Sequence, residues 1–242
     1  MTESFPRVEP LGEQALLVRF ADVLEDAANR ACLAFRAALE DAALPGVAET
    51  ASSLGSVLVR FEGEGAPVRH RLDALLGERD WREARLPAAR RWRIPCSFGG
   101  RDGPQLAETA DMVGLTESHA VEALAAATVR VLALGFAPGM PYLGILPDAW
   151  DLPRQTGLTP RVPEGALVVA VRQFVLFGTE APTGWRQVGW TAFRCFEPDR
   201  RRPIALAPGD EVRFVPTDPD ALRRGAEADL EGHGGATWEA AA

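Results

Sequence analysis

Two arginines on loops stiffened by proline are the residues of this sequence best suited to bind a small anion. Arg154 follows Pro153, and Arg161 stands between Pro160 and Val162-Pro163. Proline restricts the backbone in advance, so less conformational entropy is lost when a guanidinium binds a carboxylate or a phosphate. We therefore expect Arg154 and Arg161 to bind the acidic group of a small substrate.

The stretch Gly135-Phe-Ala-Pro-Gly-Met-Pro-Tyr-Leu143 predicts the wall of a site. Its two glycines and two prolines, Pro138 and Gly139 among them, fix an unusual backbone path and interrupt any helix or central strand. Phe136 and Tyr142 flank that path. A plain surface turn needs fewer constraints, which favours a binding site; the alternative is a rigid corner of a barrel.

Two tryptophans and one glutamine add further candidates for the same site. Trp185 and Trp190 each follow a glycine, so both indoles stand beside flexible backbone. They suit a pocket wall, and they equally suit the filling of a barrel. Gln173 opens an apolar strand, so its amide needs a partner, either backbone or ligand.

The other reactive side chains give no catalytic constellation, and the catalytic residues stay unknown. No histidine stands beside a serine nucleophile of the Gly-x-Ser-x-Gly type, which favours solvated or capping roles for His70, His119 and His233. The cysteines have no metal-ligand spacing, which indicates small buried hydrophobes at Cys32, Cys96 and Cys195. We expect no metal site.

The sequence contains no lysine. This excludes a Walker A lysine, a pyridoxal Schiff base and a biotinyl-lysine on this chain. We therefore expect no cofactor here, and if ATP is used, another polypeptide binds it.

Charge and composition exclude some classes of protein. A net charge of −8 argues against a nucleic-acid partner, because phosphate binding requires clustered positive charge. No apolar run approaches the roughly 20 residues that span a bilayer, and the first residues lack the pattern of a secretory signal. These features predict a cytoplasmic protein without a membrane contact.

The N-terminal part predicts a small split βαβ domain over residues 1–88. Short apolar or alternating runs indicate strands at 15–20 and 57–61. Apolar residues at helical spacing indicate one helix from Ala27 and another that starts at Pro67.

The remaining chain predicts a β-barrel or sandwich domain over residues 89–218. Helices are expected at 105–113 and after the N-cap Thr116 to about residue 127. Short apolar runs between glycines and prolines predict strands at 129–134, 166–171, 174–177, 193–196 and 211–215. A tail over 219–242 is expected to form a surface helix or a frayed end.

Several of these segments together resemble a known family. They match the family of the 5-oxoprolinase B subunit, also called allophanate hydrolase subunit 1, which includes the kinase inhibitor KipI. The residues that carry the resemblance are Leu11–Val18, Leu44–Glu49, Ser56–Val59, Ile94–Gly100, Leu134–Leu143, Leu152–Arg154, Val162–Gly165, Gln173, Gly184-Trp185, Val188–Thr191 and Pro208–Phe214. The chain resembles a divergent member, since Ala166 stands where the family has serine and Trp190 where it has arginine.

The resemblance implies an α+β protein with a small N-terminal domain and a cyclophilin-like β-barrel. It implies a hydrolase subunit that is active only in complex with a companion C subunit (subunit 2) and with a further A subunit. In that complex, 5-oxoproline is opened to glutamate at the expense of ATP, or a related small amide is hydrolysed. Related carboxyltransferase-type domains act in urea degradation. Substrate-binding residues are then expected at Phe136, Pro138, Gly139, Tyr142, Arg154, Arg161, Gln173, Trp185 and Trp190.

Two alternatives remain at the level of sequence. One is a KipI-like protein that binds and inhibits a histidine kinase without enzymatic activity. The other is a scaffold domain, because one fold serves many functions.

Overall fold

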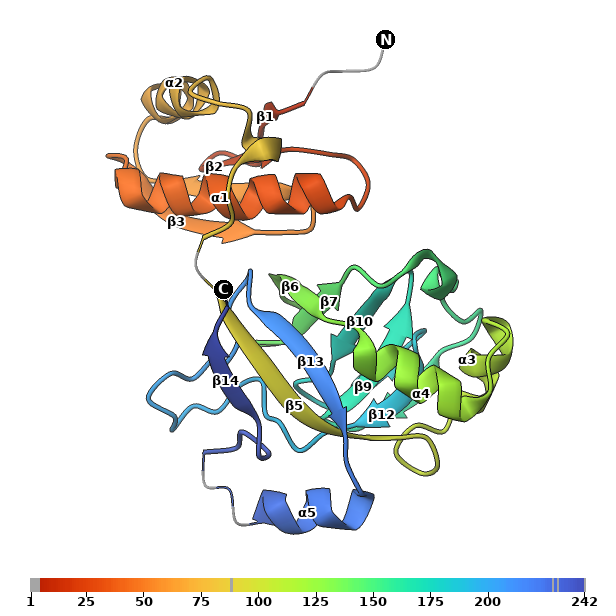
Figure 1. Cartoon of the computed structure of the whole chain (residues 1–242). Coiled ribbons are helices and arrows are strands. Elements are labelled where there is room, and N and C mark those ends of the chain that lie inside the picture. The colour runs from red at the N-terminus through yellow and green to blue at the C-terminus, as the bar shows by residue number, and fades with distance from the viewer. Residues whose placement is uncertain (1–4, 88, 228, 230, 242) are drawn as a thin grey trace. The chain divides into compact units, whose positions relative to one another are not determined.

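The computed structural model describes residues 5–87, 89–227, 229 and 231–241, and these form two compact units that meet in sequence at Ala88 and Ala89 (Figure 1). Each unit has hydrophobic clusters of its own. No helix in the described part of the chain is long and apolar enough to cross a membrane.

The first unit is a four-stranded antiparallel sheet with two helices, in the strand order β1-β2-β4-β3. β4 pairs with both β2 and β3, so β2 and β3 run parallel on either side of it, and the split βαβ prediction is confirmed. Edge strand β1 was not predicted. The elements are β1 (Arg7–Pro10), β2 (Ala15–Arg19), α1 (Asp26–Ala42), β3 (Val47–Ser52), β4 (Ser56–Phe61), α2 (Gly65–Leu76) and the 3-10 helix η1 (Trp81–Glu83).

Aromatic packing closes the core of this unit. The rings of Phe35 on α1 and Trp81 on η1 meet edge to face, with centroids 5.1 Å apart, and Phe20 lies 5.6 Å from Phe35. Such pairs add to the free energy gained by burying apolar area. The 3-10 helix η1 therefore contributes to the core of the first unit through Trp81.

The second unit is a mixed barrel of seven strands, and the predicted barrel is confirmed. The sheet order is β12-β9-β10-β7-β6-β13-β5-β14, and an additional pairing of β12 with β5 closes the ring. β13 runs parallel to β5, which makes the barrel mixed. The barrel strands are β5 (Arg90–Phe98), β6 (Val129–Leu134), β7 (Pro141–Gly144), β9 (Ala166–Ala170), β10 (Gln173–Leu176), β12 (Arg186–Trp190) and β13 (Glu211–Pro216).

Both faces of the β9–β10 hairpin are buried. Phe174 of β10 faces the barrel interior, where it meets Phe214 at 5.6 Å, while Val175 belongs to a second apolar cluster with Met140 and Trp185. Strands that are buried on both sides have continuous apolar sequences. The sequence therefore predicts the first and last residues of β9 and β10 to within one position.

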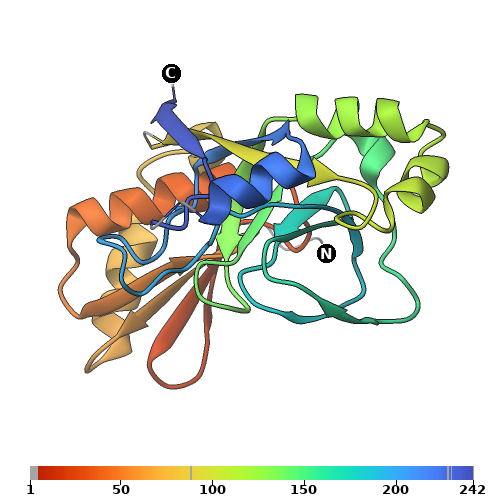
Figure 2. The same ribbon diagram turned by 90° about the horizontal axis from the view of Figure 1, so that it is seen from below.

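Helices cover the sides and one end of the barrel. α3 (Leu106–Met112) and α4 (Glu117–Ala126) lie next to each other, and the predicted N-cap Thr116 accepts a hydrogen bond from the N–H of His119 at 3.3 Å. α5 (Pro219–Glu227) lies below the barrel in Figure 1 and in front of it in Figure 2, so it covers that end.

The segment after α5 returns to the sheet. β14 (Thr237–Ala240) pairs antiparallel with the first half of β5, opposite Arg90 to Arg93. The sequence predicts only a helix or frayed end there, because a tail of alanine, glycine and glutamate has no strand alternation. Pairing to an open edge, rather than local preference, forms this strand.

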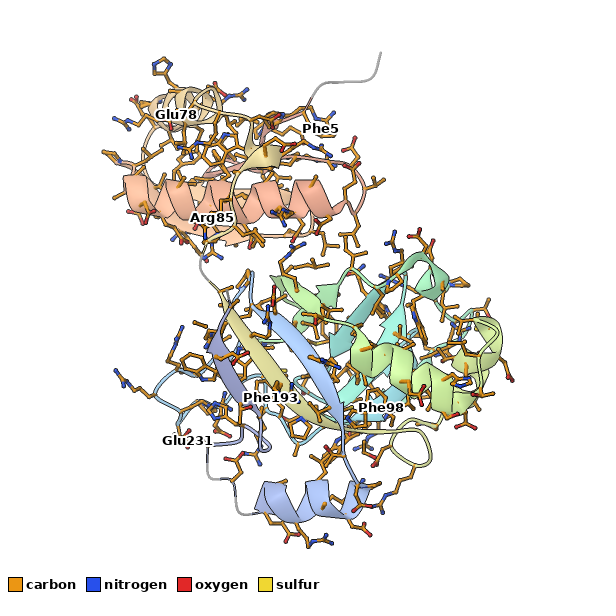
Figure 3. All side chains as sticks on the ribbon, viewed as in Figure 1. Phe5, Glu78, Arg85, Phe98, Phe193 and Glu231 are labelled. Atoms are coloured by element: carbon orange, nitrogen blue, oxygen red, sulfur yellow. The ribbon has the colours of Figure 1, made fainter. Side chains whose placement is uncertain are left out.

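The predicted strand at 193–196 is wrong. Phe196 makes one isolated bridge to Ile204, and the rest of the segment has no ladder. Phe193, which is labelled in Figure 3, and Cys195 are buried. Phe193 packs edge-on against Trp92, with centroids 5.5 Å apart. The apolar alternation therefore reflects a loop whose side chains cap the core.

Four strands near the candidate site escape the sequence patterns because they are short or rich in glycine, proline and charge. They are the barrel strands β7 and β12 and the two strands of a separate ribbon, β8 (Thr159–Val162) and β11 (Ala181–Thr183).

Candidate functional site

The glycine–proline block forms the turn from β6 to β7. Gly135 donates to the carbonyl of Met140 at 3.0 Å, and Pro141 is the first residue of β7. β7 is a central strand, so the block does not interrupt it; proline is tolerated at its first position. Gly139 has φ +67°, and a Cβ there would lie 2.6 Å from the carbonyl oxygen of Cys195.

Phe136 also has a positive φ, 73°, which is uncommon for a residue other than glycine. Its side chain is 74% exposed. The turn thus holds a strained backbone with a large apolar ring directed to the surface, which is a pattern found at binding sites.

A pocket of about 310 Å³ opens beside this turn, on the outer side of the β9–β10 hairpin. Val175, Phe177 and Met140 form its floor, and they belong to the second apolar cluster. Four of the predicted residues come together here. The lining is Phe136, Met140, Tyr142, Arg154, Gln155, Leu158, Val175, Phe177, Pro182, Thr183, Gly184 and Trp185.

Two aromatic rings and one cation define the chemistry of the pocket. Tyr142 on β7 meets Trp185 edge to face, with centroids 6.4 Å apart. The guanidinium of Arg154 lies over the Trp185 ring, 5.4 Å from its centroid. Arg154 is exposed, and no ion pair among the described residues includes it. Its positive charge is therefore available to an anion.

Hydrogen bonds fix the loop that carries Arg154. The N–H of Gln155 donates to the carbonyl of Gly184 at 2.7 Å, and its Nε2 donates to the carbonyl of Trp185 at 3.0 Å. Arg186 donates from Nη1 to the carbonyl of Pro153 at 2.7 Å. Sequence reasoning missed Gln155, because the backbone carbonyl to which its side chain donates lies about 30 residues further along the chain.

The structure does not bring Arg161 into this pocket. Arg161 lies on β8, its side chain is 74% exposed, and its Nε is 2.6 Å from the carboxylate of Glu180. Hydrogen bonding to this carboxylate raises the pKa of Arg161. Its charge is already compensated, unlike that of Arg154.

Trp190 lines a different, smaller pocket of about 190 Å³, together with Glu164 and Gly165. Its indole Nε1 donates to the carbonyl of Glu164 at 2.9 Å, and the guanidinium of Arg223 lies 5.0 Å from its ring. The two pockets share no lining residue.

Gln173 is buried at the start of β10, where it pairs with Gly144 of β7 and Ala170 of β9. It is only 5% exposed, and its Oε1 accepts no hydrogen bond from any residue that the structure describes. By strand alternation it shares a face of β10 with Val175, but it does not line the pocket.

The cysteines are buried small hydrophobes, as predicted. Burial raises the pKa of Cys32 and of Cys195 to about 12, and it raises that of Cys96 further. All three thiols therefore stay protonated near neutral pH and cannot act as nucleophiles.

The described residues contain no group of three or more histidine, cysteine, aspartate or glutamate side chains that could hold a metal ion. His233 stacks on Phe193, with centroids 6.2 Å apart, and burial lowers the pKa of its imidazole. It is not a lining residue of the Arg154 pocket.

Comparison with known proteins identifies the family. Residues 6–206 match the family model of the carboxyltransferase domain, subdomain C and D. The chain is 36% identical over 176 residues to the 5-oxoprolinase B subunit of Escherichia coli O157:H7, covering 72% of this chain and 79% of that protein. It is 29% identical over 224 residues to the 5-oxoprolinase B subunit of Bacillus subtilis (strain 168), covering 86% and 92%.

A solved structure agrees with these matches. The crystal structure of TTHA0988 superposes with a TM-score of 0.73 at 29% identity, covering 85% of this chain. This chain spans only 40% of the length of TTHA0988. The protein described here belongs to the carboxyltransferase-domain family, subdomain C and D, and is a homologue of the 5-oxoprolinase B subunit.

Proposed function

We propose that this chain is the substrate-binding subunit of a 5-oxoprolinase-type complex, in which 5-oxoproline is opened to glutamate at the expense of ATP. The names of its relatives support the assignment, since they are B subunits of 5-oxoprolinases. The complex is completed by a companion C subunit (subunit 2) and by an A subunit. The absence of lysine supports an ATP site on one of those partners. A cytoplasmic location stays a prediction.

The observation that carries this proposal is the uncompensated guanidinium of Arg154 in an aromatic pocket. A guanidinium matches a carboxylate in two parallel hydrogen bonds, and the rings of Tyr142 and Trp185 suit a small flat ring beside it. In this arrangement Arg154 binds the carboxylate of 5-oxoproline, and Phe136, Tyr142 and Trp185 enclose its lactam. Arg161 has no part in binding, because Glu180 already neutralises it.

The lining of the pocket explains why this chain would act only in complex. Its members include no carboxylate, imidazole or thiol, and its hydroxyl groups are those of Tyr142 and of Thr183, which accepts a hydrogen bond from the N–H of Trp185. In this proposal the chain holds and orients the substrate, and the main acid, base and nucleophile come from the partner subunits.

Replacement of Arg154 tests the proposal. We expect Arg154→Ala, assembled with the A and C subunits and supplied with ATP, to lower kcat/KM for glutamate release from 5-oxoproline by about 10- to 100-fold. This corresponds to the loss of a charged hydrogen bond of roughly 1.5–3 kcal/mol. Arg161→Ala removes the same charge from the proline-rich strand β8 and is the matched control, with activity within about twofold of wild type. The absence of glutamate release from the complete wild-type assembly would reject the proposal.

A second candidate function has one observation in its favour. Phe136 and Leu158, at the mouth of the pocket, are 74% and 70% exposed, and exposed apolar side chains of this size occur at protein interfaces. A KipI-like inhibitor that binds a histidine kinase would use them. Capture of a purified kinase by the wild-type chain and by Arg154→Ala, but not by Phe136→Ser, would favour this function over the first.

A further inference from the structure

Four amide groups, two of side chains and two of the backbone, are joined by three hydrogen bonds into a continuous chain that ends at the wall of the Arg154 pocket. The backbone N–H of Gln187 donates to Oε1 of Gln105 at 2.8 Å. Nε2 of Gln105 donates to Oε1 of Gln155 at 2.7 Å. Nε2 of Gln155 then donates to the backbone carbonyl of Trp185 at 3.0 Å. We call these four residues the amide chain.

The direction of every bond in the amide chain is determined by its two ends. A backbone N–H at Gln187 can only donate, and a backbone carbonyl at Trp185 can only accept. Both glutamine side chains must therefore point their oxygens toward Gln187 and their nitrogens toward Trp185. Neither amide can flip without placing two donors or two acceptors face to face.

Gln105 occupies a position where a side chain ordinarily accepts a hydrogen bond from the first turn of the helix. It is the N-cap residue of α3, yet its side chain accepts no hydrogen bond from the helix backbone. Serine, threonine, aspartate and asparagine are preferred at that position because they satisfy the free N–H groups. The side chain of Gln105 is committed instead to Gln155, a residue of the pocket.

The first turn of α3 holds the Arg154 loop at a second point. Glu108 accepts from Nε of Arg186 at 2.8 Å, and Nη1 of Arg186 donates to the carbonyl of Pro153. Pro153 and Gln155 are the two neighbours of Arg154. The helix therefore fixes the backbone on both sides of the cation, from residues that do not line the pocket.

We propose that Gln105 is a positioning residue for the anion site. It acts through Gln155 to hold Arg154 over Trp185, so that the guanidinium is directed correctly before the carboxylate arrives. This inference deepens the proposed function and rests on it. Preorganisation of this kind raises affinity by reducing the ordering required on binding.

Gln105→Glu tests the inference with little change in shape. A carboxylate still accepts from the N–H of Gln187, but it cannot donate to Oε1 of Gln155. The Gln155 amide must then either flip, which breaks its bond to the carbonyl of Trp185, or keep its oxygen facing the new carboxylate, which repels it. Gln14→Glu adds the same charge at an exposed site of the first unit and is the matched control. Gln105→Ala serves as a second variant that adds no charge.

Two measurements are made on the full chain. Hydrogen–deuterium exchange without ligand should be about tenfold faster in peptides that cover residues 153–159 for Gln105→Glu and Gln105→Ala, and unchanged for Gln14→Glu. Calorimetric titration with 5-oxoproline should give a Kd about tenfold weaker for both Gln105 variants, with a thermal unfolding midpoint near that of wild type. A merely structural role would lower the midpoint and leave exchange in that loop no faster than elsewhere.

The possible failures are distinguishable. Wild-type protein that binds no 5-oxoproline overturns the proposed function and this inference with it. A different result overturns the inference alone. In that case the wild-type protein binds 5-oxoproline, Arg154→Ala does not, and both Gln105 variants bind and exchange as the wild type does.

Discussion

The same local pattern at two arginines leads to two different chemical situations. Arg154 and Arg161 both stand on proline-rich segments, and the sequence alone predicts the same role for both. Pairing of β8 with β11 brings Glu180 next to Arg161, whereas no carboxylate among the described residues pairs with Arg154. The charge that is free to bind a ligand is thus decided by a strand pairing that the sequence pattern does not reveal.

Single residues also decide the shape of the β6–β7 turn. We expect Gly139→Ala to lower the free energy of unfolding by at least about 2 kcal/mol, because a side chain is strained at positive φ and would collide with the carbonyl of Cys195. Gly135→Ala is the matched control, since nothing lies within 4 Å of the added carbon, and its change should stay within about 0.5 kcal/mol. Chemical denaturation measures both; equal effects would show that the backbone at Gly139 is not constrained as described.

At the scale of elements, the sequence predicts those strands whose burial alone dictates their composition. β9 and β10 are buried on both faces and are found within one residue, whereas β7, β8, β11 and β12 are missed. Residues 193–196 are predicted as a strand but form a loop, because a buried loop can have the same apolar alternation as a strand. Burial is visible in a sequence, but hydrogen-bonding partners far along the chain are not.

The residues of the candidate site also fall into those that the sequence reveals and those that it does not. Aromatic residues at a strained turn and a cation beside proline could be recognised from residue types, and Phe136, Tyr142, Arg154 and Trp185 do line one pocket. Gln105 and Gln155 could not, because their amides are defined by each other and by backbone about 30 to 80 residues away.

A partly buried ion pair links α5 to the barrel. Arg223 of α5 bonds through its guanidinium to both oxygens of Asp102, a carboxylate that is almost fully buried. Burial by itself would raise the pKa of Asp102, but hydrogen bonds from Arg223 and Ser97 outweigh it and lower the pKa below its usual value.

This lowered pKa gives the pair a defined pH dependence. A carboxyl group with a lower pKa in the folded state contributes stability above its unfolded pKa, near 4, and loses that contribution as the pH falls through the folded value. We expect Asp102→Asn to be destabilised by about 1–3 kcal/mol at pH 7, and the difference from wild type to shrink as the pH falls below about 4. Urea unfolding across this range measures it.

Asp111→Asn, at an exposed position at the end of α3, is the control and should differ from wild type by less than about 0.5 kcal/mol at every pH. A constant difference between Asp102→Asn and wild type from pH 7 to pH 3 would contradict the assignment.

At the scale of the whole molecule, the chain is organised as two units with separate cores. The hydrophobic cluster of the first unit ends at Trp81, and that of the barrel begins at Trp92. All residues of the Arg154 pocket and of the amide chain lie in the second unit. The anion site that we propose is therefore built without any residue of the first unit.

This organisation predicts the result of limited proteolysis. Arg85, labelled in Figure 3, is exposed and lies in the sequence between the residues of the two cores. The residue after it is Leu86, so trypsin can cut there. Because folded cores resist proteases and exposed segments between them do not, we expect an early cut after Arg85 that leaves a stable fragment of residues 86–242. That fragment should bind 5-oxoproline with a Kd within about twofold of the full chain, as measured by calorimetry.

Replacement of Arg85 by glutamine should delay the first cut without changing the affinity of the intact protein. Loss of binding in a fragment that still shows a cooperative thermal transition would mean that the first unit completes the site, and the assignment of the pocket to the barrel alone would be wrong.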